Sequence, residues 1–157
     1  MKLFPILLLL VNLAFGQEVA VFTSGTEGHK SYRIPAIISL KNKDLLAFAE
    51  GRVNNSGDFG DINIVMKRST DKGKTWSPIK ILVNYASLQA GNPAPVVDML
   101  DPEHPQGVVY LFYNTGNNHE GEVRKGKGLR EVWYIKSTDQ GNTWSDAVNI
   151  TLQAHRP

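Results

Sequence analysis

An arginine stands directly before an apolar segment near the start of the chain, in the stretch Tyr32-Arg33-Ile34-Pro35. A charge placed next to a buried strand is costly unless an opposite charge compensates it. A second arginine, Arg52, follows the next apolar segment, and a loop rich in glycine and aspartate, residues 53–61, comes after it. Guanidinium groups bind carboxylates through two parallel hydrogen bonds. These residue types therefore indicate a site for an anionic, hydroxylated ligand, provided that the fold brings them together.

The two arginines lie at the ends of a predicted β-hairpin with strands at residues 34–40 and 45–50. If its polar turn is centred between residues 42 and 43, antiparallel pairing sets Arg33 roughly opposite Arg52. The next predicted strand, residues 62–69, starts at that same end and crosses to the other at about 3.3 Å per residue. Both arginines and the loop between the second and third strands are thus expected at one rim, where binding loops gather.

Ion pairing within the protein is the alternative role for these arginines. Arg33 and Arg52 could each pair with Glu50, Asp58 or Asp61. Such surface salt bridges are common and individually contribute little to stability. The residues alone leave both interpretations open.

An eight-residue pattern occurs twice, as STDKGKTW at residues 69–76 and STDQGNTW at residues 137–144. Each copy follows a segment rich in β-forming residues, and each position has a role in a tight turn. The aspartate accepts bonds from turn amides, the glycine tolerates positive φ, and the threonine hydroxyl adds a local bond. The tryptophan covers apolar surface beside the turn. We therefore expect this motif to be structural and to lie at the end opposite the arginines.

Short apolar runs separated by Gly, Asn, Asp and Pro, with no helical periodicity after residue 17, predict an all-β chain. A repeated unit of this kind cannot bury both of its faces alone, which is typical of the blades of a β-propeller. Residues 17–157 provide about two blades, so we expect the N-terminal part of a larger propeller domain.

Composition narrows the function further. The chain has 157 residues, a net charge of +2 and no basic run, which argues against nucleic acid as a partner. It has no cysteine, and its four histidines show no metal-ligand spacing, so neither a metal nor another cofactor is expected. Residues 1–16 resemble a signal peptide with a cleavage site after Gly16, which predicts export. The apolar part of that segment falls short of the ~20 residues of a spanning helix, so no stable membrane span is expected.

Four stretches resemble the N-terminal part of the exo-alpha-sialidase (neuraminidase) family, whose six-bladed propellers carry repeated Asp boxes (BNR repeats). They are YRIPAI, LLAFAEGR, GDINIVMKRSTDKGKTW and GNPAPVVD, and the resemblance runs from about residue 32 to residue 151. It implies a glycoside hydrolase that removes terminal sialic acid from glycoproteins, glycolipids and oligosaccharides, with about the first two blades present here. Asp boxes by themselves occur in propellers of many functions, so the RIP stretch with the GR strand carries most of the specificity.

The resemblance also implies roles for individual residues. Arg33 would be one of three arginines that hold the substrate carboxylate, and Arg52 would contact the region of the sugar's 4-hydroxyl. Asp58 would be the general acid and base, with Asp61 as the alternative. Asn92, near the substrate's N-acetyl side, is a further candidate contact, although a proline-framed strand start explains it equally well.

Other parts of the family's machinery have no counterpart that we can place in this sequence. The family uses a tyrosine nucleophile activated by a glutamate, with retention of configuration, and these residues belong to later blades. Tyr110, Tyr113 and Tyr134 lie inside apolar runs, where packing is the expected role. By itself this chain is therefore expected to be inactive.

The long polar loop 114–129 returns to the binding rim by the same strand count, so Glu120 or Glu122 could bond sugar hydroxyls. Two other functions remain open: a non-catalytic Asp-box propeller that binds glycans or protein, and a transglycosylating relative that transfers sialic acid to another sugar.

Overall fold

A computed structural model describes residues 18–154 of the chain. The predicted signal peptide, residues 1–16, lies outside the described residues. Within the described part, none of the helices has the length and apolar character that crossing a membrane requires.

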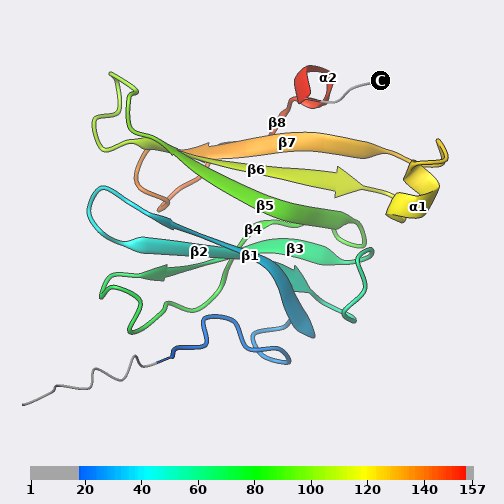
Figure 1. Cartoon of the computed structure of the whole chain (residues 1–157), viewed down its shortest axis with the longest axis horizontal. Helices are drawn as coiled ribbons and strands as arrows, with labels where there is room; N and C mark the ends of the chain where they lie inside the picture. The colour runs from blue at the N-terminus through cyan, green and yellow to red at the C-terminus, as the bar shows by residue number, and fades with distance from the viewer. Residues whose placement is uncertain (1–17, 155–157) are drawn as a thin grey trace, which may run out of the picture.

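The chain folds into two four-stranded antiparallel units, which confirms the predicted all-β class (Figure 1). The first blade contains β1 (Ser31–Ser39), β2 (Leu45–Arg52), β3 (Ile62–Ser69) and β4 (Lys80–Val83). The second blade contains β5 (Gln89–Asp98), β6 (Val108–Gly116), β7 (Arg130–Ser137) and β8 (Val148–Asn149). The described residues also contain two four-residue helices, α1 (Glu120–Val123) between β6 and β7 and α2 (Thr151–Ala154) after β8. Neither helix was predicted.

The two blades lie side by side and share one apolar core. A single parallel bridge between Ile62 of β3 and Gln89 of β5 joins their edges at one end, and the sheet does not close on itself. The core between them contains buried side chains from both blades, including Leu46, Phe48, Ile64, Val109, Leu111 and Ile135. Burial of each large side chain contributes about 1.5–3 kcal/mol, so the two blades stabilise each other.

Both Asp-box turns form at the end of the blades opposite the rim loops, as predicted. In the first, Asp71 Oδ1 accepts a bond from the Thr75 amide at 2.9 Å, and its Oδ2 accepts the Thr75 hydroxyl at 2.6 Å. Asp139 and Thr143 repeat both contacts in the second turn. The hydrogen bonds from Thr75, side chain first, lower the pKa of Asp71 to about 2. Each motif therefore closes its own turn.

The second Asp box also packs against the first blade. Trp144 meets Phe48 edge to face, with ring centroids 6.2 Å apart. Three cations of the first blade donate to main-chain carbonyls of the second: Lys41 to Pro105, Arg68 to Gln140 and Lys80 to Asn142. The motif thus helps to fix one blade to the next as well as closing a turn, and the loop between β5 and β6 adds the contact at Pro105.

The three tyrosines of the apolar runs pack as expected. Tyr113 is buried, and its hydroxyl lies 3.0 Å from that of Tyr85. Burial, with the Tyr85 contact, raises the pKa of Tyr113 well above its usual range, so it stays protonated. Tyr110 and Tyr134 stack edge to face on the other side of the second blade.

Candidate active site

A register shift in β1 shapes the rim and corrects the predicted pairing of the arginines. Arg33 pairs with Glu50, and Arg52 pairs with Ser31, so the two arginines are not opposite each other. Between Arg33 and Ala36, two residues of β1 face one residue of β2, which is the signature of a β-bulge. The prediction assumed an unbroken ladder. Its conclusion that both arginines lie at one end still holds.

The second blade repeats this bulge at the equivalent place. The register of β5 shifts between Gly91 and Ala94, and each bulge contains a residue followed by proline. Ile34 has φ 51° in the first bulge, and Asn92 has φ 54° in the second. Positive φ is unfavourable for an asparagine and more so for a β-branched isoleucine, so the surrounding structure must hold both residues there. Both Ile34 and Asn92 line one cavity.

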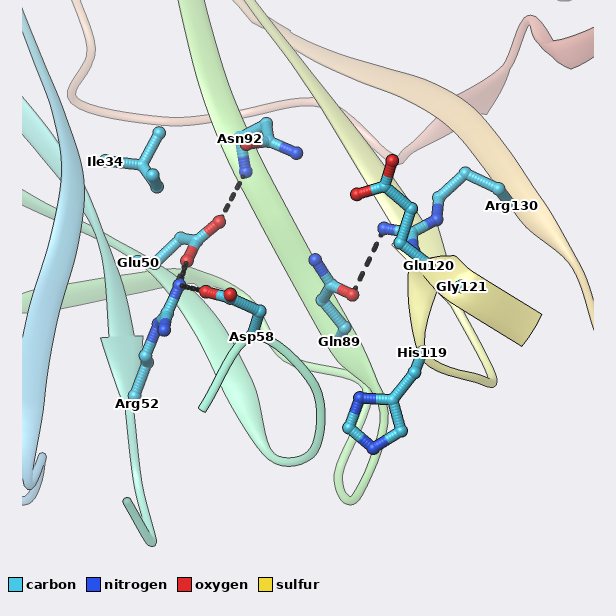
Figure 2. Close-up of a pocket in the computed structure, with 10 residues that line it drawn as sticks. All are labelled: Ile34, Glu50, Arg52, Asp58, Gln89, Asn92, His119, Glu120, Gly121 and Arg130. Atoms are coloured by element: carbon cyan, nitrogen blue, oxygen red, sulfur yellow. Dashed lines mark hydrogen bonds and ion pairs between the residues drawn. The ribbon is translucent and has the colours of Figure 1, made fainter. Parts of the chain in front are cut away.

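That cavity opens between the two blades at the rim and has a volume of about 350 Å³ (Figure 2). Its wall on the first blade includes Glu50, Arg52 and Asp58. Its wall on the second blade includes Gln89, Asn92, Glu120 and Arg130. Most of the lining groups are therefore polar or charged, as a site for a hydroxylated ligand requires.

Arg52 is the centre of the ion-pair network on the first wall. Its side chain is only 3% exposed, and its Nη2 lies 2.6 Å from Glu50 Oε2 and 2.9 Å from Asp58 Oδ1. Its Nη1 donates to the carbonyl of Ser56 at 2.6 Å. Glu50 is equally buried and accepts the Asn92 amide at 2.9 Å through its other oxygen. A single buried carboxylate thus orients an arginine of one blade and the bulge of the other.

Asp58 joins the two predicted arginines. Its Oδ1 lies 2.7 Å from Arg33 Nη1 and 2.9 Å from Arg52 Nη2, while its side chain remains 77% exposed. The contact with Arg52, and then the charge of Arg33, lower the pKa of Asp58. The carboxylate is therefore ionised at neutral pH in this state.

The ion-pair alternative is present as well, with Glu50 and Asp58 as partners of the arginines. Asp61 is not among their partners in residues 18–154. Arg52 is buried rather than at the surface, and an open cavity lies beside the network. Arg33 lines a smaller neighbouring pocket with Phe22 and Pro35, and its ion pair with Asp58 connects it to the cavity. The ion pairs and a ligand site therefore coexist.

The other predicted contacts lie on the second wall. Asn92 and Glu120 line the cavity, whereas Glu122 turns to Lys125 at 2.7 Å. Loop 114–129 does return to the rim, as predicted, and α1 places Glu120 there (Figure 1).

The sequence interpretation missed several lining residues. Arg130 donates to Gln89 Oε1 at 3.2 Å, and no carboxylate among residues 18–154 lies within 4.0 Å of its guanidinium (Figure 2). Arg130 directly follows the rim loop 114–129 in the sequence, and this position could have identified it as a lining residue. Glu50 was named only as a possible ion-pair partner of the arginines; its place in LLAFAEGR, two residues before Arg52 and so on the same face of the strand, could have identified it as a lining residue as well. Gln89 and His119 gave no such signal.

Residues 43–156 match the family described as BNR repeat-like domain. The chain is 34% identical over 147 residues to an exo-alpha-sialidase of Aspergillus fumigatus, which covers 80% of this chain and 35% of that protein. It is 28% identical to a sialidase of Bacteroides fragilis, with 88% of this chain and 28% of that protein covered. The chain thus spans about a third of the length of the curated relatives that it matches.

Solved structures show the same architecture. The Hadza microbial sialidase Hz136 superposes with a TM-score of 0.72 and 27% identity, covering 85% of this chain and 28% of the other. The Trypanosoma rangeli sialidase in complex with sialic acid has a TM-score of 0.62 at 18% identity, over 80% of this chain and 21% of the other, and shows the fold alone. The chain therefore belongs to the BNR repeat-like domain family and forms propeller blades of the sialidase type.

Proposed function

We propose that this chain forms the first two blades of a retaining exo-α-sialidase that hydrolyses terminal sialic acid from glycoconjugates. The observation that supports it most directly is the convergence of Arg33 and Arg52 on Asp58 beside a polar cavity between the blades. The relatives named as sialidases support the same activity.

The residues fit the chemistry of an acidic sugar. Sialic acid carries its carboxylate on the anomeric carbon, so an arginine can both orient the sugar and stabilise an oxocarbenium-like transition state. Arg33, half exposed at the rim, supplies this contact in our proposal. A carboxylate nucleophile would be repelled by the substrate, and we propose that a tyrosine on a later blade takes its place.

Asp58 is proposed to protonate the leaving oxygen and then to activate water. It needs a proton for the first step, whereas the two arginines lower its pKa in the ligand-free chain. When the substrate carboxylate binds Arg33, it neutralises one of these charges and adds a negative charge nearby. Both changes raise the pKa of Asp58, so the substrate itself prepares the acid.

The second blade completes the proposed site. Asn92 and Glu120 face the cavity with groups that can bond the N-acetyl and hydroxyl substituents. Gln89 and Arg130 add donors on the same wall. These assignments make the cavity a site for a single sugar ring with several polar substituents.

The test uses the protein that contains this chain together with its remaining blades, and a fluorogenic sialoside. Asp58→Ala and Arg33→Ala should each reduce turnover by about 10²-fold or more, with the fold intact by circular dichroism. Asp61→Ala and Lys74→Ala are the controls, because Asp61 forms no ion pair with either arginine and Lys74 is exposed in the Asp-box turn at the opposite end of the first blade. Sialic acid binding without turnover in the unaltered protein would favour the non-catalytic propeller instead.

A further inference from the structure

One aromatic contact connects the two loops that border the cavity. Phe59 lies on the loop between β2 and β3, directly after Asp58, and His119 lies before Glu120 on the loop between β6 and β7. Their ring centroids are 5.0 Å apart, with the planes tilted by 51°. The contact therefore joins the first blade to the second at the cavity, next to the residue proposed as the acid.

The first half of the Asp58 loop is fastened to its own blade. Arg52 donates to the carbonyl of Ser56 at 2.6 Å, and the Gly57 amide donates to Asn55 Oδ1 at 2.7 Å. Ser31 also donates to the carbonyl of Asn55, at 3.2 Å. These bonds hold the chain up to the residue before Asp58.

The second half has fewer such bonds. The Val53 amide donates to the carbonyl of Asp61 at 3.0 Å and closes the base of the loop. Gly60 has φ 122°, a conformation that glycine adopts more freely than other residues. Between Asp58 and this glycine, the half-buried Phe59 ring provides the contact across the cavity mouth.

The backbone of His119, whose ring contacts Phe59, is held by several hydrogen bonds. Its carbonyl accepts the amides of Glu122 and Val123, both at 3.0 Å, and its amide donates to Asn118 Oδ1 at 2.8 Å. The side-chain amide of Asn118 donates in turn to the carbonyl of Lys127 at 3.0 Å. The backbone of His119 is thus fixed within its own loop, so its imidazole can restrict the motion of Phe59.

We propose that His119 is a positioning residue, whose ring holds Phe59 and thereby keeps the Asp58 carboxylate over the cavity. This inference rests on the proposed role of Asp58 as the acid. Because an acid contributes most where the leaving group is poor, loss of the His119 ring should harm some substrates far more than others. A merely structural role would reduce activity on all of them alike.

The first experiment compares two aglycones in the complete protein. With His119→Ala, kcat/KM for a sialoside with a sugar aglycone should fall about tenfold, because a displaced acid loses part of the 10²–10⁴-fold that it supplies. For a sialoside with a nitrophenol aglycone, the change should stay within about twofold. His119→Phe should restore the sugar substrate, since it keeps a ring against Phe59. His104→Ala, on the loop between β5 and β6, is the matched control.

The second experiment needs no activity. Amide hydrogen exchange of Val53 and Gly57, whose amides donate to Asp61 and Asn55 within the loop, should quicken about fivefold in His119→Ala and remain at the original rate in His119→Phe. Equal losses on both aglycones, or unchanged exchange in His119→Ala, would overturn the inference. If the unaltered protein hydrolyses no sialoside, the proposed function fails, and the exchange rates still decide whether His119 holds the loop.

Discussion

Replacing Asp58 by asparagine tests whether this carboxylate occupies Arg33 until a ligand arrives. In the ligand-free chain, Asp58 Oδ1 lies 2.7 Å from Arg33 Nη1, and the two side chains are 77% and 48% exposed. A ligand carboxylate that uses Arg33 must therefore displace Asp58. Removing the charge of Asp58 removes this internal competitor, whereas Arg52 keeps its buried partner Glu50 at 2.6 Å.

The magnitude follows from the exposure of the pair. Exposed ion pairs contribute about 0.2–1 kcal/mol, which corresponds to a factor of about 1.4 to 5 in a binding constant. We therefore expect Asp58→Asn to bind free sialic acid as tightly as the original protein or up to about fivefold more tightly. Turnover of a sialoside with a sugar aglycone should fall by about 10²–10⁴-fold, because the acid is lost.

Isothermal titration of free sialic acid into the complete protein measures the first quantity, and initial rates measure the second. Asp61→Asn is the control, since it removes a loop carboxylate that contacts neither arginine. Added salt offers a further check, because it screens the Arg33–Asp58 pair. The difference in affinity for free sialic acid between the original protein and Asp58→Asn should therefore become smaller at higher salt. A loss of binding greater than about tenfold in Asp58→Asn would refute the displacement argument, since it would mean that Asp58 mainly holds the ligand.

Three further predictions concern the turns and the cavity floor. The hydrogen bonds of Asp71 lower its pKa to about 2; at Asp139, burial opposes the shift, but bonds from Thr143 and its neighbours still lower the pKa to about 2. A carboxyl group whose pKa is lowered on folding stabilises the folded state at pH values above its unfolded pKa near 4. Thermal melts should therefore show stability falling from pH ~4 to ~2, and falling less steeply in Asp139→Asn than in the original protein. Gly141→Ala should cost about 1–3 kcal/mol by urea denaturation, because its φ is 84° and a Cβ would lie 2.6 Å from the buried Leu46; equal stability would contradict the packing described for this turn. Gly91→Ala should lower both the melting temperature and activity, because its Cβ would push the ends of Gln89 and the buried Glu50, at 2.6 and 2.8 Å, out of their places in the cavity; unchanged kcat/KM would argue against that placement.

The Asp-box turns and the first three strands could be predicted from the sequence because their determinants are local. The Asp-box residues make their bonds within four positions of one another, so the motif contains its own partners. The predicted strand at residues 62–69 has those bounds in the structure for the same reason, since turn-forming residues border it on both sides. The meeting of Arg33 and Arg52 at one end followed from hairpin geometry.

The register and the far wall of the cavity depend on contacts that no short stretch contains. The bulge at Ile34 requires positive φ at a β-branched residue, which local preference argues against. Gln89 and Arg130 come together because β5 and β7 belong to one blade, and they face Arg52 because β3 and β5 meet edge to edge. The hairpin could not reveal this neighbour. Asn92 and Glu120 were predicted on the second wall from the family resemblance and from loop 114–129, whereas Gln89 and Arg130 were not predicted.

The lysine and arginine bonds from the first blade end on main-chain oxygens of the second. Every amino acid carries such an oxygen, so positions 105, 140 and 142 can vary in evolution without loss of the acceptor, provided that the turn keeps its shape. Lys41, Arg68 and Lys80 have no such freedom, because only a long cationic side chain reaches across. A family of homologous sequences should therefore show strong selection on the three donors and drift at the three acceptors.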